Sequence, residues 1–275
     1  MSVKKEASGR RSVKVEVEVP GTPEQVWQAI ATGPGISAWF VPTELEEREG
    51  GATTSHFGPG MDSHAVIKTW EPPHRFTAEE RDIGPESPVV ATEWIVEARS
   101  GSTCVVRVVH SLFTDTDDWD RQLEGWESGW PGFFKILRLY LTHFRGQPNA
   151  TFYVRGAASG PAPEAWRHLL EPLGLAGATA GQHWRAPAGV PPLGGTIEEV
   201  VEGDHNILLL RLDAPTSGIG YFFAHPMGGQ VYMVLGFYLY GADAAATAAR
   251  DEPAWNAWLT ERFKPAADAN LSPTA

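Results

Sequence analysis

Three histidines in the first half of the chain are the side chains best suited to acid–base chemistry. His56, His64 and His110 carry imidazoles, which titrate near neutral pH and are the usual general bases of enzymes. Glu93 could orient one of them, but it sits next to Trp94 in an alternating run, so an inward Trp94 would turn Glu93 to solvent. The alternative for each histidine is an ordinary hydrogen-bonded or exposed side chain, and no residue is assigned a catalytic role.

Aromatic residues form the second candidate group. The sequence contains 11 Trp and 12 Phe, and rigid apolar rings suit either a thick core or the wall of an apolar pocket. Both interpretations are open for each ring. The candidate ligand-binding residues of the first half are Trp39, Phe40, His56, Trp70, Phe76, Trp94, His110, Phe113, Trp130 and Phe134.

A similar group in the second half is expected to be core. Met fills irregular cores as readily as it adapts to ligands. The group comprises Tyr221, Phe223, His225, Met227, Tyr232, Met233, Phe237 and Tyr238.

Motifs for other chemistries are missing from the sequence. One cysteine, Cys104, allows no intramolecular disulfide, and its alternating context predicts a buried, unactivated thiol. No zinc-protease motif, nucleophile elbow or phosphate-binding loop occurs. The sequence therefore predicts no metal and no cofactor.

Composition and charge narrow the classes of partner. The chain has 275 residues, 42 % hydrophobic and 20 % charged, with a net charge of −12. This balance is that of a globular protein, and its acidity disfavours nucleic acid. No apolar run approaches a membrane span or a signal peptide, which predicts no membrane insertion and a cytoplasmic location. The basic first eleven residues are expected to be a flexible tail, and the sequence does not indicate the oligomeric state.

Alternation and periodicity predict an α+β module in the first half. Residues 13–19 alternate strictly as a strand, and residues 22–27 (Thr-Pro-Glu-Gln-Val-Trp) carry the cap and proline of a helix start. Strands are expected between about 41 and 113, with 65–70 pairing with 75–80 and 91–98 with 103–110. A short helix is expected over 116–126, and a longer amphipathic helix is expected to open at Gly129-Trp130-Pro131.

The same order of elements then recurs. A strand at 151–158 precedes Pro163-Glu164-Ala165-Trp166, which echoes the first helix start, and the strand and the tryptophan keep the same offset. Strands are expected near 195–201, 206–212, 219–225 and 230–240, with a turn at 203–206 and a final helix with Pro253 in its first turn. This pattern predicts a tandem duplication of one α+β module, each copy a curved antiparallel sheet with a long C-terminal helix.

Several segments of the first module together resemble one family. These are residues 22–27, Trp39-Phe40-Val41-Pro42, residues 66–75 with Trp70-Glu71-Pro72-Pro73, and Gly129-Trp130. The strand Thr92-Glu93-Trp94 and the turn Gly101-Ser102-Thr103 leading to His110-Ser111-Leu112-Phe113 also fit. The module is similar to the SRPBCC (START-like) superfamily, and within it to the activator of heat-shock protein 90 ATPase. The expected domains are 12–146 for this module and 150–265 for a diverged second copy, with flexible tails at 1–11 and 266–275. The resemblance implies a helix-grip fold, in which a seven-stranded antiparallel sheet wraps a long helix and encloses a cavity.

The resemblance leaves three functions open. The first is non-catalytic binding, transport or sequestration of a hydrophobic small molecule. The second is a polyketide cyclase or dehydratase on the same scaffold, with His56 or His110 as its inward ionisable residue. The third is a chaperone-interacting protein of the ATPase-activating kind, which would carry an exposed patch in place of a pocket.

Overall fold

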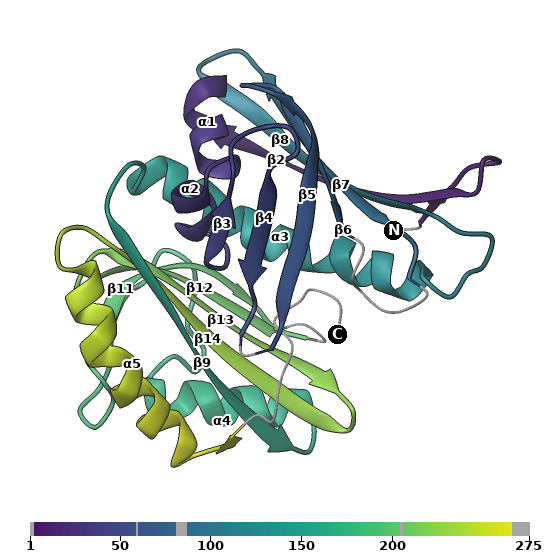
Figure 1. The fold of residues 1–275 in the computed structure, drawn as a ribbon. Coiled ribbons are helices and arrows are strands. Elements are labelled where there is room, and N and C mark those ends of the chain that lie inside the picture. The colour runs from purple at the N-terminus through teal and green to yellow at the C-terminus, as the bar shows by residue number, and fades with distance from the viewer. Residues whose placement is uncertain (1–2, 59, 81–86, 204–205, 266–275) are drawn as a thin grey trace. The chain divides into compact units, whose positions relative to one another are not determined.

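The chain forms two compact units, which divide between Arg145 and Gly146. The computed structural model describes residues 3–58, 60–80, 87–203 and 206–265. Residues 204–205 of the expected turn and the expected tail 266–275 lie outside the described residues. Each unit is described by itself below (Figure 1).

The described residues of the first unit form strands and three helices. Its elements are β1 (Lys4–Lys5), β2 (Arg10–Pro20), α1 (Pro23–Ile30), α2 (Gly33–Ser37), β3 (Thr43–Leu45), β4 (Ala52–His56), β5 (Asp62–Glu71), β6 (Arg75–Glu80), β7 (Val90–Ala98), β8 (Thr103–Phe113) and α3 (Asp120–His143).

One antiparallel sheet organises this unit, with the strand order β1-β2-β8-β7-β6-β5-β4-β3. The first long strand, β2, pairs along its whole length with β8, the last, from Arg10 opposite Phe113 to Pro20 opposite Thr103. Along the chain, helices α1 and α2 lie between β2 and the remaining strands of the sheet, and α3 follows β8. This is the helix-grip order, and the expected α+β fold class is confirmed. The expected pairing of residues 65–70 with 75–80 and of 91–98 with 103–110 is also confirmed.

Helix α1 begins where the sequence predicts. The Thr22 side chain accepts from the Gln25 backbone N–H, the Gln25 side chain accepts from the Thr22 N–H, and Pro23 starts the helix. Both bonds satisfy amide groups that would otherwise have no partner at a helix start. Val26, Trp27 and Ile30 are buried on its inner face.

Helix α3 is one helix of 24 residues, where the sequence predicted two. Pro131 lies inside it, although a proline removes one helical hydrogen bond and costs about 3 kcal/mol. The apolar stripe runs without a break from Leu123 through Trp126 and Trp130 to Leu137, and all four side chains are buried. Burial of this stripe outweighs the local cost of the proline, which is why the sequence prediction of a boundary there was wrong.

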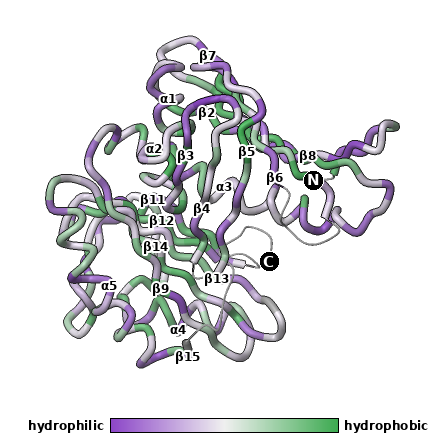
Figure 2. Tube along the Cα trace, viewed as in Figure 1, coloured by the Kyte–Doolittle hydropathy of each residue, from purple (hydrophilic) through white to green (hydrophobic). Residues whose placement is uncertain are grey.

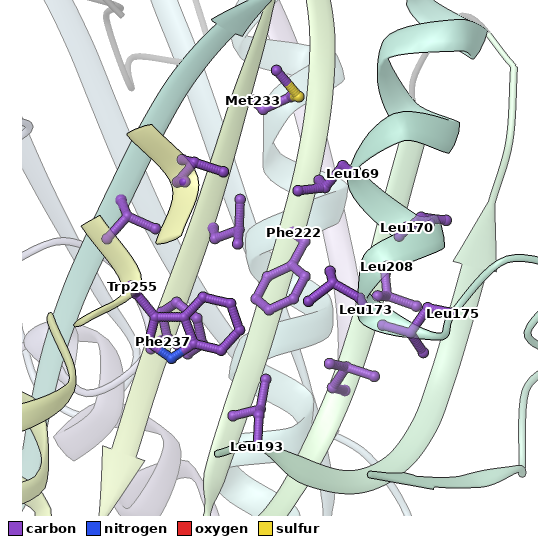
Figure 3. Packing of buried hydrophobic residues seen from close by; sticks show 14 of the residues in the cluster. Leu169, Leu170, Leu173, Leu175, Leu193, Leu208, Phe222, Met233, Phe237 and Trp255 are labelled. Atoms are coloured by element: carbon purple, nitrogen blue, oxygen red, sulfur yellow. The ribbon is translucent and has the colours of Figure 1, made fainter. Parts of the chain in front are cut away.

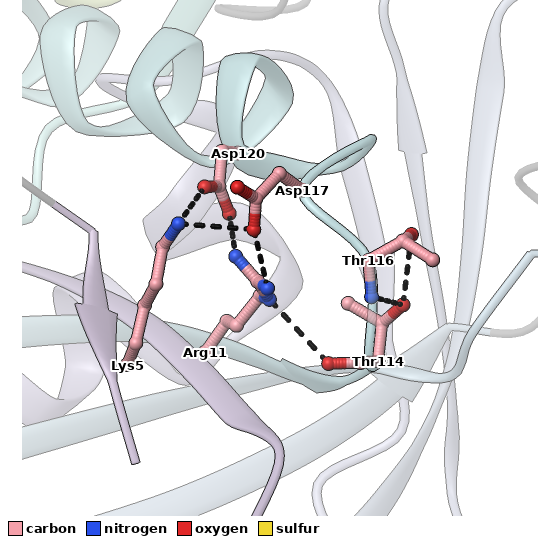
Figure 4. Close-up of polar contacts among 6 residues, drawn as sticks. All are labelled: Lys5, Arg11, Thr114, Thr116, Asp117 and Asp120. Carbon is pink, nitrogen blue, oxygen red and sulfur yellow. Dashed lines mark hydrogen bonds and ion pairs between the residues drawn. The ribbon is translucent and has the colours of Figure 1, made fainter.

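The basic N-terminal segment is ordered where the structure describes it, in place of the expected flexible tail. Lys4 and Lys5 pair with Ser12 and Arg11 as strand β1. The Lys5 ammonium lies 2.6 Å from Asp120, and the buried Arg11 guanidinium lies 2.6 Å from both Asp117 and Asp120 (Figure 4). The four charges hold the first strands to the start of α3, where a carboxylate also suits the helix dipole.

The second unit repeats this arrangement. Its elements are β9 (Asn149–Ser159), α4 (Ala162–Leu173), β10 (His183–Arg185), β11 (Gly194–Val201), β12 (Asn206–Ala214), β13 (Gly218–Met227), β14 (Gln230–Tyr240), α5 (Ala244–Thr260) and β15 (Lys264–Pro265). The order is β10-β11-β12-β13-β14-β9-β15, so that the first strand again pairs with the last long one. Among the described residues, this sheet has one strand, β10, between α4 and β11, where the first unit has two, β3 and β4, between α2 and β5. At the other edge β15 pairs with β9, as β1 pairs with β2 in the first unit. The tandem arrangement is confirmed by this shared topology.

Both helices of the second unit pack on one face of its sheet. Figure 3 shows Leu169, Leu170 and Leu173 of α4 and Trp255 of α5 around Phe222 and Phe237 of the sheet. The hydrophobic stretches of this unit follow β12, β13 and β14 (Figure 2).

The expected core group of the second unit divides between the two faces of its sheet. Met233 and Phe237 lie in the core beneath the helices, whereas the buried Tyr238 is on the alternate face, where its hydroxyl bonds that of Tyr153 at 2.9 Å.

Helix α5 starts at Ala244, well before Pro253, which the sequence placed in its first turn, because Ala244 and Ala248 extend its buried side.

Candidate functional site

A cavity of about 370 Å³ opens between the sheet and the helices of the first unit. Its volume falls in the range of sites for small molecules. The described lining residues are Ile36, Phe40, Thr43, Leu45, Thr53, Ser55, Phe57, Met61, Asp62, Ser63, Ala65, Phe76, Ala78, Glu80, Val90, Thr92, Trp94, His110, Gln122, Trp126 and Trp130.

The strand period of two decides which sheet residues reach this cavity. In β6 the inward residues are Phe76, Ala78 and Glu80, and in β7 they include Thr92 and Trp94. Cross-strand pairing places Phe76 opposite Trp94 and Ala78 opposite Thr92. Large rings therefore line one part of the wall, and a small and a hydroxylated side chain line the next row.

Aromatic rings from β7, α3 and the loop between α2 and β3 meet at the helix side of the cavity. The Phe40 and Trp130 rings are stacked, with centroids 5.2 Å apart and planes 22° apart. The Trp94 ring meets Trp130 edge-on at 5.1 Å and 89°. Phe133 of α3 contacts Phe40 from behind at 4.6 Å. Edge-on and offset contacts of this kind are the favoured geometries of aromatic pairs, so the wall is fixed by its own packing.

His110 is the central polar residue of the wall and is bonded on both ring nitrogens. The Trp130 indole Nε1–H donates to His110 Nε2 over 2.6 Å, and His110 Nδ1 lies 2.9 Å from the Thr92 hydroxyl. An indole N–H can only donate, so Nε2 must be an unprotonated acceptor and the neutral ring carries its proton on Nδ1. Nδ1–H then donates to Thr92 Oγ1.

Burial keeps His110 neutral. Desolvation lowers the pKa of its imidazole from 6.5 to about 3. The Trp126 ring lies 5.0 Å from the imidazole and helps to exclude water. Because the lone pair on Nε2 is held by Trp130, His110 has no free basic nitrogen to accept a proton from a ligand.

Hydroxyl groups line the cavity around the strands β3, β4 and β5. Thr43 donates to the Val41 carbonyl at 2.9 Å and shares a 3.1 Å bond with Ser55. Thr53 and Ser63 also line this part. The site is thus aromatic on one side and hydroxylated on the other.

Five of the ten ligand-binding candidates line the cavity. They are Phe40, Phe76, Trp94, His110 and Trp130. Three more pack behind the wall: Trp39 donates its Nε1–H to the Ala29 carbonyl at 2.8 Å, Trp70 contacts Trp27, and Phe134 contacts Trp130. Trp39 and Phe134 are buried in the core, and Trp70 is half-buried.

The other two candidates face away from the cavity. Phe113 is 64 % exposed, because inward residues of β8 have even numbers and Phe113 is three residues from His110. His56 lies one residue beyond the inward Ser55, with its Nδ1 2.9 Å from Asp62. Their expected place on the inner wall is corrected to the outer face of the sheet.

The remaining polar candidates form hydrogen bonds or ion pairs within the protein. His64 Nδ1 bonds the Thr54 hydroxyl at 3.1 Å, and Glu93 pairs with Arg75 at 2.7 Å on the outer side of the sheet. The Cys104 thiol is buried and donates to the Gly21 carbonyl at 3.3 Å, and burial raises its pKa.

Thr92 and Trp126 belong to the site but were missed by the sequence reasoning. Thr92 lies two residues before Trp94, so a strand that turns Trp94 inward must turn Thr92 inward too. Trp126 lies four residues before Trp130, the spacing that puts both on one face of a helix. The false helix boundary at residue 129 hid the second signal.

No helix among the described residues is long and apolar enough to cross a membrane.

Residues 20–142 match the family model described as Activator of Hsp90 ATPase homolog 1-like protein. The match confirms the family expected for the first unit. A comparison of the sequence with curated proteins gives no match.

Solved structures similar to the chain are distant in sequence. The di-domain ARO/CYC BexL from the BE-7585A biosynthetic pathway is 13 % identical over 94 % of this chain and 100 % of its own, with a TM-score of 0.44. DynU16, from the dynemicin biosynthetic locus, is 16 % identical over 90 % of this chain and 95 % of its own, with a TM-score of 0.42. The Aha1 dimer from Colwellia psychrerythraea is 19 % identical over 47 % of this chain and 95 % of its own, with a TM-score of 0.41.

Proposed function

We propose that the first unit, which belongs to the Activator of Hsp90 ATPase homolog 1-like family, binds a hydrophobic small molecule in its cavity without chemically changing it. The observation that carries this proposal is the cavity of about 370 Å³ with Phe40, Phe76, Trp94 and Trp130 on its wall. Burial of a ligand against such rings is favourable by about 25 cal/mol per Å² of apolar surface. The few polar groups on the wall would orient the ligand.

The state of His110 supports binding over catalysis. A polyketide cyclase or dehydratase on this scaffold is the alternative, and it needs a base with an available lone pair on the wall. Trp130 occupies the Nε2 lone pair, and the Nδ1 proton is directed at Thr92. The other histidine considered for this role, His56, faces away from the cavity and is bonded to Asp62. Acid–base chemistry at either imidazole would require these bonds to break first.

The exposed side chains of the described residues also favour ligand binding in the cavity over a protein-docking role. A chaperone-interacting protein would be expected to present a contiguous exposed apolar or charged patch in place of an open pocket. Among the residues that the structure describes, the large hydrophobic side chains that are exposed are Val66, at 42 %, and Phe113, at 64 %. They lie on β5 and β8, which are separated in the sheet by β6 and β7, so they do not form one apolar patch.

Two measurements test this function. Native mass spectrometry of the freshly purified protein, followed by denaturing extraction, would detect a co-purified apolar molecule and its stoichiometry. Titration with N-phenyl-1-naphthylamine, an uncharged fluorophore that brightens in apolar surroundings, would detect an open cavity directly.

A pair of variants assigns the signal to the cavity. Ala78→Phe puts a ring into the cavity, whereas Ala91→Phe places the same ring on the outer side of the sheet, between the inward Val90 and Thr92. We expect Ala78→Phe to abolish the fluorescence response and Ala91→Phe to keep it, with both proteins folded by circular dichroism. A response that survives Ala78→Phe unchanged, or a wild-type protein that gives no response and carries no molecule, would refute the proposal.

A further inference from the structure

We propose that the Thr92 hydroxyl selects ligands for the cavity by donating a hydrogen bond, so that the first unit prefers apolar ring compounds that carry an uncharged oxygen acceptor, such as a ketone. This inference rests on the proposed function of the cavity, and it adds the chemical class of the ligand. Thr92 acts on the ligand directly, and His110 and Trp130 act through Thr92 as positioning residues.

The first step is the direction of the bonds behind Thr92. Trp130 Nε1–H has no lone pair to offer, so it fixes His110 Nε2 as the acceptor over 2.6 Å. The neutral ring then has its single proton on Nδ1, which points at Thr92 Oγ1 over 2.9 Å. Both nitrogens are buried with the ring, so water does not compete for either of them.

The second step concerns the remaining proton of Thr92. A threonine hydroxyl has one proton and two lone pairs, and here one lone pair is used by His110. Among the described residues, His110 is the hydrogen-bond partner that the Thr92 hydroxyl has, and Thr92 lies on the cavity wall. Its proton is therefore available to a ligand as a donor. Donation from His110 also polarises this O–H group, because hydrogen bonds in a chain strengthen one another.

Two other hydroxyls of the wall, those of Thr43 and Ser55, are arranged differently. Thr43 gives its proton to the Val41 carbonyl, so Ser55 must be the donor in their shared 3.1 Å bond. Both protons are thus used inside the protein. Thr92 lies next to the aromatic wall and accepts from His110, so its own proton is left to donate into the cavity.

Charge on the wall favours an uncharged acceptor over an anion. The described lining includes two acidic residues, Asp62, whose carboxylate is also paired with His56, and Glu80, and it contains no lysine or arginine. An anionic ligand would lack a cationic partner there and would be repelled by these groups in a partly desolvated site. A ketone or quinone oxygen accepts a hydrogen bond without this penalty.

An isosteric pair of probes tests the preference. 2-Acetylnaphthalene carries a carbonyl oxygen where 2-isopropenylnaphthalene carries a methylene group, and each is used to displace N-phenyl-1-naphthylamine. A net hydrogen bond of ordinary strength gives about a fivefold preference for the ketone in the wild-type protein. We expect Thr92→Val to reduce this preference to about one while N-phenyl-1-naphthylamine still binds, and Thr92→Ser, which keeps the hydroxyl, to restore it.

Thr77→Val is the matched control. It makes the same change of hydroxyl to methyl on neighbouring β6, but Thr77 is on the outer side of the sheet, where it bonds Thr69 at 2.8 Å. Its preference should stay at the wild-type value. A wild-type preference that persists in Thr92→Val overturns the inference. Failure of the wild-type protein to bind any of the three probes would instead refute the proposed function.

The tautomer of His110 gives an independent test that needs no ligand. Long-range proton–nitrogen NMR spectra distinguish an Nδ1-protonated imidazole from an Nε2-protonated or a charged one. We expect His110 to be Nδ1-protonated at neutral pH in the wild-type protein and in Thr92→Val. An Nε2-protonated or charged ring would overturn the inference whatever the binding experiments show.

Discussion

The indole of Trp130 and the imidazole of His110 are joined by a 2.6 Å hydrogen bond that links α3 to β8 across the wall of the cavity. The rings are also nearly parallel, with centroids 5.8 Å apart and planes 21° apart. One tryptophan therefore fixes the position, the tautomer and the neutral state of the histidine. Removing this tryptophan should have consequences that removal of its neighbours does not.

Trp130→Phe should destabilise the protein and remove the bond that fixes the tautomer of His110. The variant leaves His110 Nε2 as a buried acceptor without its donor, which costs about 1–3 kcal/mol in addition to the lost ring contacts. Urea denaturation would measure the free energy of unfolding, and NMR would report a mixed tautomer population for His110. Trp126→Phe is the control, because Trp126 contacts the imidazole at 5.0 Å but no indole hydrogen bond joins the two. Equal losses in the two variants would contradict the role assigned to the bond.

Stability should fall at mildly acidic pH because His110 resists protonation. Burial lowers its pKa to about 3, whereas the same residue in the unfolded chain titrates near 6.5. The unfolded state therefore binds more protons between these values, and stability is lost as pH falls from about 6.5 toward 3. Between pH 7 and pH 5 the loss from this residue is about 2 kcal/mol.

The same urea experiment at pH 7 and pH 5 in wild type and His110→Gln isolates this contribution. Glutamine can still accept a hydrogen bond from Trp130 but does not titrate. Titratable groups common to both proteins cancel in the comparison. A wild-type protein with the same pH dependence as the variant would show that the imidazole does not have the lowered pKa.

Local signals in the sequence predicted most of the elements, because short-range chemistry determines them. Thr22 and Gln25 form a cap from residues three apart, and alternation over 13–19 is enough to define one face of a strand. The order of elements then implied the repeat. Glu93 was correctly expected to face away from the side of the sheet occupied by Trp94.

The cavity was harder to predict because tertiary packing assembles it. His110 and Phe113 were both expected on the inner wall, yet residues three apart in a strand point to opposite faces. Trp130 and His110 are 20 residues apart, and nothing in their spacing indicates a hydrogen bond. Pro131 predicted a helix boundary from local cost alone, whereas burial along α3 decides the outcome.

The charge cluster at the start of α3 should stabilise the N-terminal strands against this helix. Asp120→Asn keeps the shape of the side chain but removes the charge that lies 2.6 Å from both Lys5 and Arg11. We expect a lower unfolding midpoint at low ionic strength, with a smaller difference from wild type at high salt, because screening weakens the wild-type pairs. Asp118→Asn, at the residue next to Asp117 and outside the cluster drawn in Figure 4, is the control. A difference that does not change with salt would contradict an electrostatic role.

Two phenylalanines on opposite faces of the sheet test the assignment of the cavity wall. Phe76 is buried against Trp27 and Trp94 and lines the cavity, whereas Phe113 is exposed on the outer face. Phe76→Leu should cost about 1 kcal/mol of stability and weaken binding of N-phenyl-1-naphthylamine several-fold, because it removes an aromatic contact from the wall. The same substitution at Phe113 should change stability by less than about 0.5 kcal/mol and leave probe binding unaltered. Equal weakening of binding by Phe113→Leu and Phe76→Leu would contradict the assignment of the cavity as the binding site.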